Sequence, residues 1–242
     1  MPHLESTDIV FIIGLTGVGK SSSLAALAQS GADFHLLPNR RQLTDDIIIP
    51  AMLSYLGKPI KPVLDRVMRF ELTRLYKEQH PGGMAEVVAS YLRQHHIPSD
   101  VLVFDNLRGQ NELAYAAQAF PKARFVMFDA AEDIRLQRIL GREAVFDQTT
   151  SFQLSSLSQL PDIPNTSPEE IAKALKIIES EKQNYNVEET RDFIFEAIAP
   201  ERRLYINTGD KPLEQVVRKL SLWFQQYIPL APQNSSPSSL HC

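Results

Sequence analysis

A glycine-rich segment near the start of the chain has the residue types and spacing of a phosphate-binding loop. Residues 14–21 read Gly-Leu-Thr-Gly-Val-Gly-Lys-Ser and fit the pattern G-x-x-x-x-G-K-[ST]. Its glycines let the backbone curl, so that several N–H groups point at one anion beside the positive end of a helix. Lys20 would reach the β- and γ-phosphates of a nucleotide, and the Ser21 hydroxyl would ligate Mg²⁺. The predicted nucleotide contacts are Gly14, Thr16, Gly17, Val18, Gly19, Lys20, Ser21 and Ser22.

The flanking residues supply the setting that such a loop needs. Residues 8–13 begin with Asp8 and continue as an apolar, mostly β-branched run, which favours a strand. Leu24, Leu27 and Ala28 share one side of a helix that would follow. A phosphate-binding loop requires this order of strand, loop and helix. The alternative is a glycine-rich turn from a strand to a helix that binds no ligand.

A carboxylate ends another apolar run. Asp105 closes the run 101–105, and in phosphate-loop proteins a carboxylate there contacts Mg²⁺ directly or through water. We expect Asp105 to bind Mg²⁺ or to act as a base. The alternative is that its carboxylate only caps the turn that follows the strand. Arg108 and Glu112 follow, and both could face the cleft at the carboxyl end of the sheet, where open α/β sheets bind ligands.

Two groups of arginines could bind phosphoryl groups. Arg135, Arg138 and Arg142 lie at i, i+3 and i+7, so they project from one helix face. We expect Arg138 and Arg142 to reach the transferring phosphoryl group from a closing lid, where they would stabilise transition-state charge. The alternative is a solvated face paired with Glu132 and Asp133.

The second group of arginines precedes the run at 101–105. Arg40, Arg41, Arg66 and Arg69 lie in this region, with Asp65 beside them, and the last two arginines share a helix face. Arginines that face a cleft suit bidentate recognition of a phosphate or carboxylate on an acceptor. The alternative is ordinary surface charge.

The remaining pattern alternates strands with helices, which is typical of a mostly parallel sheet covered on both faces. Strands are expected at 8–13, 33–37, 101–105, 123–129 and 203–207, and helices at 43–56 with a break at Pro50, 62–78, 84–95, 111–120, 131–142, 167–185 and 212–227. Ser167, Pro168 and Glu170 form a capping-box signature. Residues 146–166 are typical of a mobile loop, and 229–242 of a disordered tail.

Composition narrows the classes of function. The chain has 242 residues, 43% of them apolar, and a net charge of −4, which suits one α/β domain and disfavours a general nucleic-acid or anionic-membrane surface. Its one cysteine, Cys242, excludes a disulfide framework and a cysteine-based metal site. Without a membrane-spanning run or a signal peptide, the chain is expected to be cytoplasmic.

Taken together, these residues resemble the small-molecule kinases with a phosphate-binding loop, among them nucleoside and deoxynucleoside monophosphate kinases and dephospho-coenzyme A kinase. The resemblance spans residues 8 to 226 and rests on segments 14–21, 104–112 and 128–142, and on the turn 206–210. It implies a three-layer α/β/α fold with a five-stranded parallel sheet, an acceptor-binding helical insertion at 38–98 and a lid at 138–200, within one domain at 1–228. It also places Asn207 near the adenine of the donor.

The predicted function is therefore ATP- and Mg²⁺-dependent transfer of a γ-phosphoryl group to a small phosphorylated, nucleotide-like acceptor. Lys20, Asp105, Arg138 and Arg142 would be catalytic, with Ser21 and Asp105 on the metal. The acceptor would be gripped by Arg40, Arg66, Arg69 and Arg108. The alternative is an ATPase or a nucleotide-dependent regulatory switch without a small-molecule acceptor. A kinase that acts on the ends of nucleic acids is disfavoured by the net negative charge of the chain.

Overall fold

The fold is built on one parallel sheet. The computed structural model describes residues 4–99, 101–140, 167–209 and 211–227. Five strands lie in the order β2-β3-β1-β4-β5, and each neighbouring pair is parallel. The predicted α/β class and five-stranded parallel sheet are therefore confirmed. The predictions for 146–166, for the tail at 229–242 and for Arg142 lie outside the described residues.

The elements follow the alternation expected from the sequence. The strands are β1 (Ile9–Ile13), β2 (His35–Leu36), β3 (Leu102–Leu107), β4 (Arg124–Asp129) and β5 (Arg203–Asn207). The described α-helices are α1 (Lys20–Gln29), α2 (Arg40–Leu43), α3 (Ile49–Tyr55), α4 (Arg66–Gln79), α5 (Gly83–Gln94), α6 (Gln110–Ala119), α7 (Glu132–Leu140), α8 (Pro168–Asn184), α9 (Val187–Ala197) and α10 (Leu213–Tyr227). Shorter helical segments are η1 (Leu4–Ser6), the π-helical η2 (Thr44–Ile48) and η4 (Pro200–Arg202).

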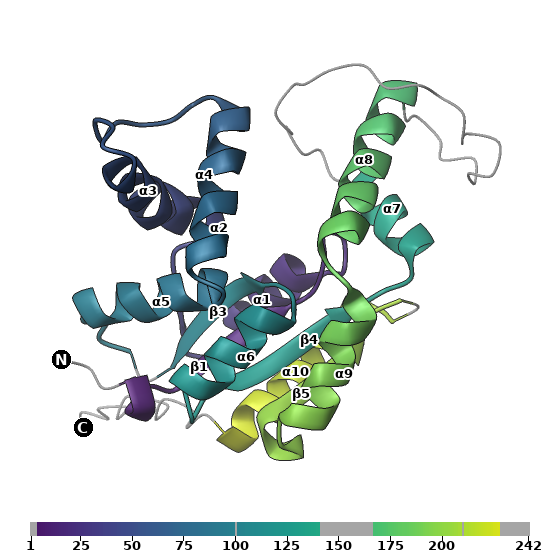
Figure 1. Ribbon diagram of the computed structural model, residues 1–242. Coiled ribbons are helices and arrows are strands. Elements are labelled where there is room, and N and C mark those ends of the chain that lie inside the picture. Colours follow the sequence, from purple (N-terminus) through teal and green to yellow (C-terminus); the bar gives the residue numbers. More distant parts are fainter. Residues whose placement is uncertain (1–3, 100, 141–166, 210, 228–242) are drawn as a thin grey trace, which may run out of the picture.

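Alternating side chains of β1 build two halves of the core. Phe11 and its neighbours on one face pack with residues of α5, α6 and α9, whereas Val10 and Ile12 pack with residues of α1 and α10. Figure 1 shows α6 and α9 on one side of the sheet and α1 and α10 on the other. The Phe11 ring lies 5.5 to 6.3 Å from three other phenylalanine rings, and each such pair contributes about 0.5–1.5 kcal/mol. The central strand is thus fixed from both faces.

Two helical projections rise beyond the same end of the strands of the sheet (Figure 1). One consists of α2, η2, α3 and α4, and we call it the arm; the other consists of α7 and α8. The arm carries exposed apolar side chains, among them Leu64, Val67 and Phe70, which are 92%, 66% and 65% exposed. No helix of the described residues has the length and apolar character needed to cross a membrane.

Two details of the helices differ from the sequence expectation. The break expected at Pro50 takes the form of a change of helix type, because π-helical η2 passes directly into α3 and Pro50 lies in the first turn of α3. Proline has no N–H with which to continue the hydrogen-bond pattern of a helix, and this pattern changes type in the turn before Pro50. The segment after Ser167 has the predicted capping box, but the chain turns at Tyr185 and Asn186, and Asn186 caps a separate helix, α9.

Helix α7 packs directly on the phosphate-binding loop at Gly17. This glycine has a φ of +87°, and a Cβ added there would lie 2.8 Å from the carbonyl oxygen of Arg135. Gly31 has almost the same φ, +88°, but a Cβ there would have nothing within 4 Å. The two glycines therefore share a backbone requirement and differ in packing.

This difference gives a matched test of the packing. We expect Gly31→Ala to cost about 1–2 kcal/mol, because alanine disfavours a left-handed backbone. Gly17→Ala should cost about 1–3 kcal/mol more, because its methyl group displaces the backbone of α7. Urea unfolding of both variants measures the two costs, and equal losses would show that α7 does not press on the loop.

Candidate functional site

The phosphate-binding motif lies between β1 and α1, where the sequence places it. Lys20 is the first residue of α1, and its side chain is buried. Its Nζ donates hydrogen bonds to the carbonyl oxygens of Gly14 at 2.7 Å and Leu15 at 3.1 Å. Ser21 and Ser22 follow on α1 and are exposed. The loop thus presents an ammonium group and two hydroxyl groups at the start of one helix.

A β-bulge shapes the strand next to the loop. Ile12 pairs with Asp105, but the next residue of β1, Ile13, pairs with Leu107, so Asn106 is an extra residue on β3. Asn106 has a φ of 87°, which is uncommon for any residue except glycine and is tolerated best by Asn and Asp. Bulges of this kind redirect side chains beside functional sites. Here the bulge follows Asp105 directly.

The Asp105 side chain has the properties of a metal ligand. Its Oδ1 is buried and has no hydrogen-bond partner among the described residues. Burial raises the pKa of Asp105 above its ordinary value, while the nearby charges of Lys20 and Arg108 oppose this rise. A carboxylate oxygen and a serine hydroxyl are the hard ligands that Mg²⁺ prefers. Asp105 and Ser21 are therefore the residues that would hold it.

The rest of the described chain agrees with this ligand set. No group of three or more acidic, histidine or cysteine side chains suited to a metal occurs among the described residues. Mg²⁺ is usually held by one or two carboxylates together with substrate phosphates and water, so no larger protein cage is required.

The bulge also organises two of the predicted acceptor arginines. Arg40 makes a bidentate pair with Glu112, at 2.8 and 2.7 Å, and donates to the carbonyl oxygen of Asn106 at 3.2 Å. Burial disfavours the charged form of Arg40, but Glu112 outweighs it and raises its pKa. Arg108 donates from Nε to Asn106 Oδ1 at 2.8 Å and from its backbone N–H to Glu112 at 2.9 Å. Asn106, Arg108 and Glu112 thus form one hydrogen-bonded cluster with Arg40.

The other predicted acceptor residues belong to the arm. Arg69 forms an ion pair with Asp45 and donates to the carbonyl oxygen of Val63 at 3.2 Å. Arg66 begins α4. The structure therefore brings Arg40 and Arg108 together at the carboxyl end of β3, whereas Arg69 is joined to its own projection.

Arg135 and Arg138, predicted to share a face, both contact the phosphate-binding loop from α7. Arg135 donates from Nε to the carbonyl oxygen of Thr16 at 2.9 Å and forms a buried ion pair with Glu181 of α8. Arg138 donates to the Thr208 hydroxyl at 2.8 Å and to the Thr208 carbonyl oxygen at 2.6 Å, with a longer contact to Gly17 at 3.4 Å. Arg135 thus contacts the loop at Thr16, and Arg138 connects the neighbouring Gly17 with the turn at Thr208.

The turn after β5 completes this side of the site. Asn207 is exposed, and its side chain accepts a hydrogen bond from the Gly209 N–H at 2.8 Å. The Thr208 hydroxyl donates to the carbonyl oxygen of Val18 at 2.8 Å, which ties the turn to the phosphate-binding loop. A cavity of about 440 Å³ lies here, lined by Gly19, Ser22, Ser23, Arg138, Thr208, Lys211, Leu213 and Val216.

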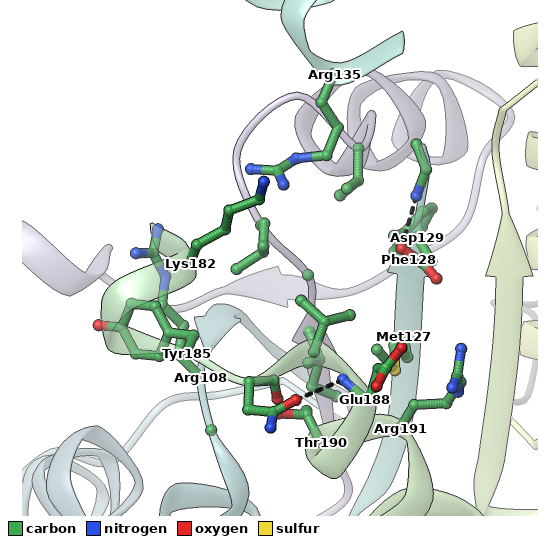
Figure 2. Close-up of a pocket in the computed structure, with 18 of the residues that line it drawn as sticks. Arg108, Met127, Phe128, Asp129, Arg135, Lys182, Tyr185, Glu188, Thr190 and Arg191 are labelled. Atoms are coloured by element: carbon green, nitrogen blue, oxygen red, sulfur yellow. Dashed lines mark hydrogen bonds between the residues drawn. The ribbon is translucent and has the colours of Figure 1, made fainter. Parts of the chain in front are cut away.

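A second cavity, of about 500 Å³, lies on the other side of the loop. Its lining includes the apolar Leu107, Met127 and Phe128, the cationic Arg108, Arg135, Lys182 and Arg191, and the carboxylates of Asp129, Glu132 and Glu188. Figure 2 shows Arg108, Met127, Phe128 and Arg135 around the opening, with Tyr185 beside Arg108. The Arg108 guanidinium lies 5.1 Å from the centre of the Tyr185 ring, within range of a cation–π contact. The cavity therefore combines an apolar surface with charged groups of both signs.

Three residues of this site were not predicted from the sequence: Glu181, Tyr185 and Thr208. Glu181 is separated from its partner Thr16 by 165 positions, so no local pattern connects them. Thr208 lies inside the turn 206–210 that the resemblance identified. This turn was the signal in the sequence that could have pointed to Thr208. Tyr185 is the last residue of the helix expected at 167–185, and only the fold shows its place at the turn between α8 and α9.

Solved structures similar to this chain include kinases of small molecules. A sugar kinase from a Janibacter species is 15% identical, with a TM-score of 0.46 over 93% of this chain and 96% of that chain. A gluconokinase from Sinorhizobium meliloti is 15% identical, with a TM-score of 0.41 over 92% and 93%. A shikimate kinase from Aquifex aeolicus is 15% identical, with a TM-score of 0.39 over 90% and 96%. No protein-family model and no curated protein matches the chain. Likeness at this level does not determine a reaction, which has to follow from the site.

The buried carboxylate of Asp105 makes the stability of the fold depend on pH. Because burial raises the pKa of Asp105 above 3.8, the folded state keeps the proton at pH values where the unfolded chain has released it. Stability conferred by protonated Asp105 is therefore lost as the pH rises through this window. We expect Asp105→Asn to stabilise the metal-free protein by a margin that grows as the pH rises above about 4.

Urea unfolding at a series of pH values measures that margin. Asp46→Asn, at an exposed carboxylate on η2, is the matched control for the loss of one carboxylate. A difference between Asp105→Asn and the unmodified protein that stays constant with pH would contradict a raised pKa of a buried carboxylate at position 105.

Proposed function

We propose that this protein is an ATP- and Mg²⁺-dependent phosphotransferase that moves the γ-phosphoryl group of ATP to a small acceptor. One observation carries the proposal. The phosphate-binding loop ends β1, and a buried carboxylate oxygen without a described partner, on Asp105, ends the adjacent strand. A phosphate cradle beside a free hard ligand is the arrangement that MgATP requires.

Each donor group has a role in this scheme. The backbone N–H groups of residues 17–22 and the Lys20 ammonium would hold the β- and γ-phosphates, and Ser21 and Asp105 would hold Mg²⁺. Bound Mg²⁺ neutralises charge on the phosphates and orients them for transfer. The cavity beside Arg138 and the Asn207 turn has room for the donor base, which would place adenine against α1 and α10. Arg138 would then stabilise the donor from the rim of the loop.

The acceptor would lie around Arg108, between the arm and the cavity of about 500 Å³. Arg40, Arg66, Arg69 and Arg108 remain our candidates for its recognition, in an acceptor-binding insertion at 38–98 opposite a lid at 138–200. A nucleotide-like acceptor is consistent with the arm, because exposed Phe70 offers a stacking surface and lies on the same helix face as Lys77. The Lys77 ammonium in turn lies 5.6 Å from the Tyr185 ring.

One observation also favours the alternative of an ATPase or regulatory switch. Arg40 and Arg69 are each neutralised by a carboxylate, so an anionic acceptor would have to compete with Glu112 and Asp45. A screen of ATP consumption separates the two functions. The protein is incubated with MgATP alone and with a panel of nucleotides and small phosphorylated metabolites. ADP release stimulated by one acceptor class identifies a kinase, whereas turnover independent of every acceptor supports the alternative.

Removing the loop lysine tests the donor site. Lys20→Ala should lower turnover by about 10²–10³-fold or more, because the variant lacks the cation that meets charge developing on the phosphates. Circular dichroism should show that the fold is intact. Lys219→Ala is the matched control, since Lys219 also donates to a backbone carbonyl, that of Tyr205, at 2.9 Å on α10. Full activity in Lys20→Ala would contradict the assignment.

A further inference from the structure

The carboxylate of Glu181 is surrounded by the donors of an anion-binding site. The Thr16 N–H donates to its two oxygens at 3.1 and 3.2 Å, and the Thr16 hydroxyl donates at 2.7 Å. Arg135 Nη2 donates to Oε2 at 2.5 Å, and Arg108 Nη2 lies 3.5 Å from Oε1. Backbone N–H, hydroxyl and guanidinium groups around one oxyanion form the donor set with which proteins bind phosphate and carboxylate ligands.

This cluster has more positive than negative charge. Two guanidinium groups, those of Arg108 and Arg135, share the single carboxylate of Glu181. Burial lowers the pKa of Arg135, and the like charge of Arg108 also lowers it, so that the attraction of Glu181 and the other nearby carboxylates does not restore its ordinary value. A ligand with more negative charge than one carboxylate would therefore be bound favourably.

Both arginines also have contacts other than Glu181. Arg135 donates from Nε to the carbonyl oxygen of Thr16, at 2.9 Å. Arg108 donates from Nε to Asn106 Oδ1, at 2.8 Å, and its guanidinium group lies 5.1 Å from the centre of the Tyr185 ring. Glu181 belongs to the last turn of α8, next to the turn at Tyr185 that leads to α9. The donors thus come from the phosphate-binding loop, from the segment after β3 and from α7, while their carboxylate comes from α8.

The 500 Å³ cavity gives a ligand access to this donor set. Arg108 and Arg135 line it together with Leu15 of the phosphate-binding loop. In Figure 2 the two arginines lie around the cavity, whose lining also includes the apolar Met127. A small molecule in the cavity could place an anionic group against both guanidinium groups while its apolar part contacts the apolar lining residues.

We propose that Thr16, Arg108 and Arg135 form an oxyanion subsite for a phosphate or carboxylate group of the acceptor, for which the Glu181 carboxylate competes. This inference rests on the proposed phosphotransfer function and gives the acceptor a chemical class: a small molecule with an anionic group and an apolar part. Glu181 then selects against weakly charged molecules, because the acceptor's anion must replace a carboxylate that is already hydrogen-bonded.

Anion titration tests the proposal. Inorganic phosphate, and separately malonate, is titrated into the full-length protein whose loop is saturated with the non-hydrolysable MgAMPPNP, and binding is followed by calorimetry. Glu181→Gln keeps the shape and the acceptor oxygen but removes the charge, so we expect it to tighten anion binding by about tenfold or more. Arg108→Gln should weaken anion binding by about tenfold and should cancel the gain in the double variant. A larger gain for phosphate or for malonate identifies which anion the subsite prefers.

The matched control is Asp8→Asn, which removes the charge of a carboxylate that forms an ion pair with Arg124, outside the site. Unchanged or weaker anion binding in Glu181→Gln, or an equal gain in Asp8→Asn, would overturn the proposal. The titration repeated in the Lys20→Ala background needs no nucleotide. Its outcome therefore stands apart from the kinase assay, and failure of the subsite is distinguishable from failure of the proposed function.

Discussion

The contact of Thr16 with Arg135 and Glu181 is the interaction on which the geometry of the site depends. The Thr16 N–H, hydroxyl and carbonyl groups are all hydrogen-bonded to this pair of buried side chains. Such a pair contributes little net stability, because desolvation offsets the attraction, but loss of one partner costs about 3–5 kcal/mol. Its effect is therefore mainly to fix position. It fixes α7 and α8 on the phosphate-binding loop.

The same contact connects the two projections with the core. Glu181 also faces Arg108, at 3.5 Å, and Arg108 stacks on Tyr185 at the turn between α8 and α9. On the side of the arm, Lys77 approaches the same aromatic ring. Tyr185 therefore meets a cation from α4 and a cation from the end of β3. A shift of α8 would therefore change contacts of both the arm and the phosphate-binding loop.

Local features of the sequence were sufficient for the sheet and for the donor side of the site. The loop at 14–21, the strand that ends at Asp105 and the capping box at Ser167 each depend on residues that are close in the chain. The pairing of charges could not be predicted in this way. Arg40 and Glu112 are 72 positions apart, and only the fold shows that they neutralise each other. The spacing on α7 correctly placed two arginines on one face, but their oxygen partners come from the loop and from the turn after β5.

The central claim is that the γ-phosphoryl group is transferred to an organic molecule and not to water. The most direct test is to incubate the protein with γ-³²P-labelled ATP, Mg²⁺ and a mixture of small nucleotides, phosphorylated metabolites and carboxylates, and to separate the products by chromatography. Our account predicts that the label appears in a small anionic organic product, and that this product is not formed by Lys20→Ala. Recovery of the label exclusively as inorganic phosphate, at the same rate without the mixture, would contradict it.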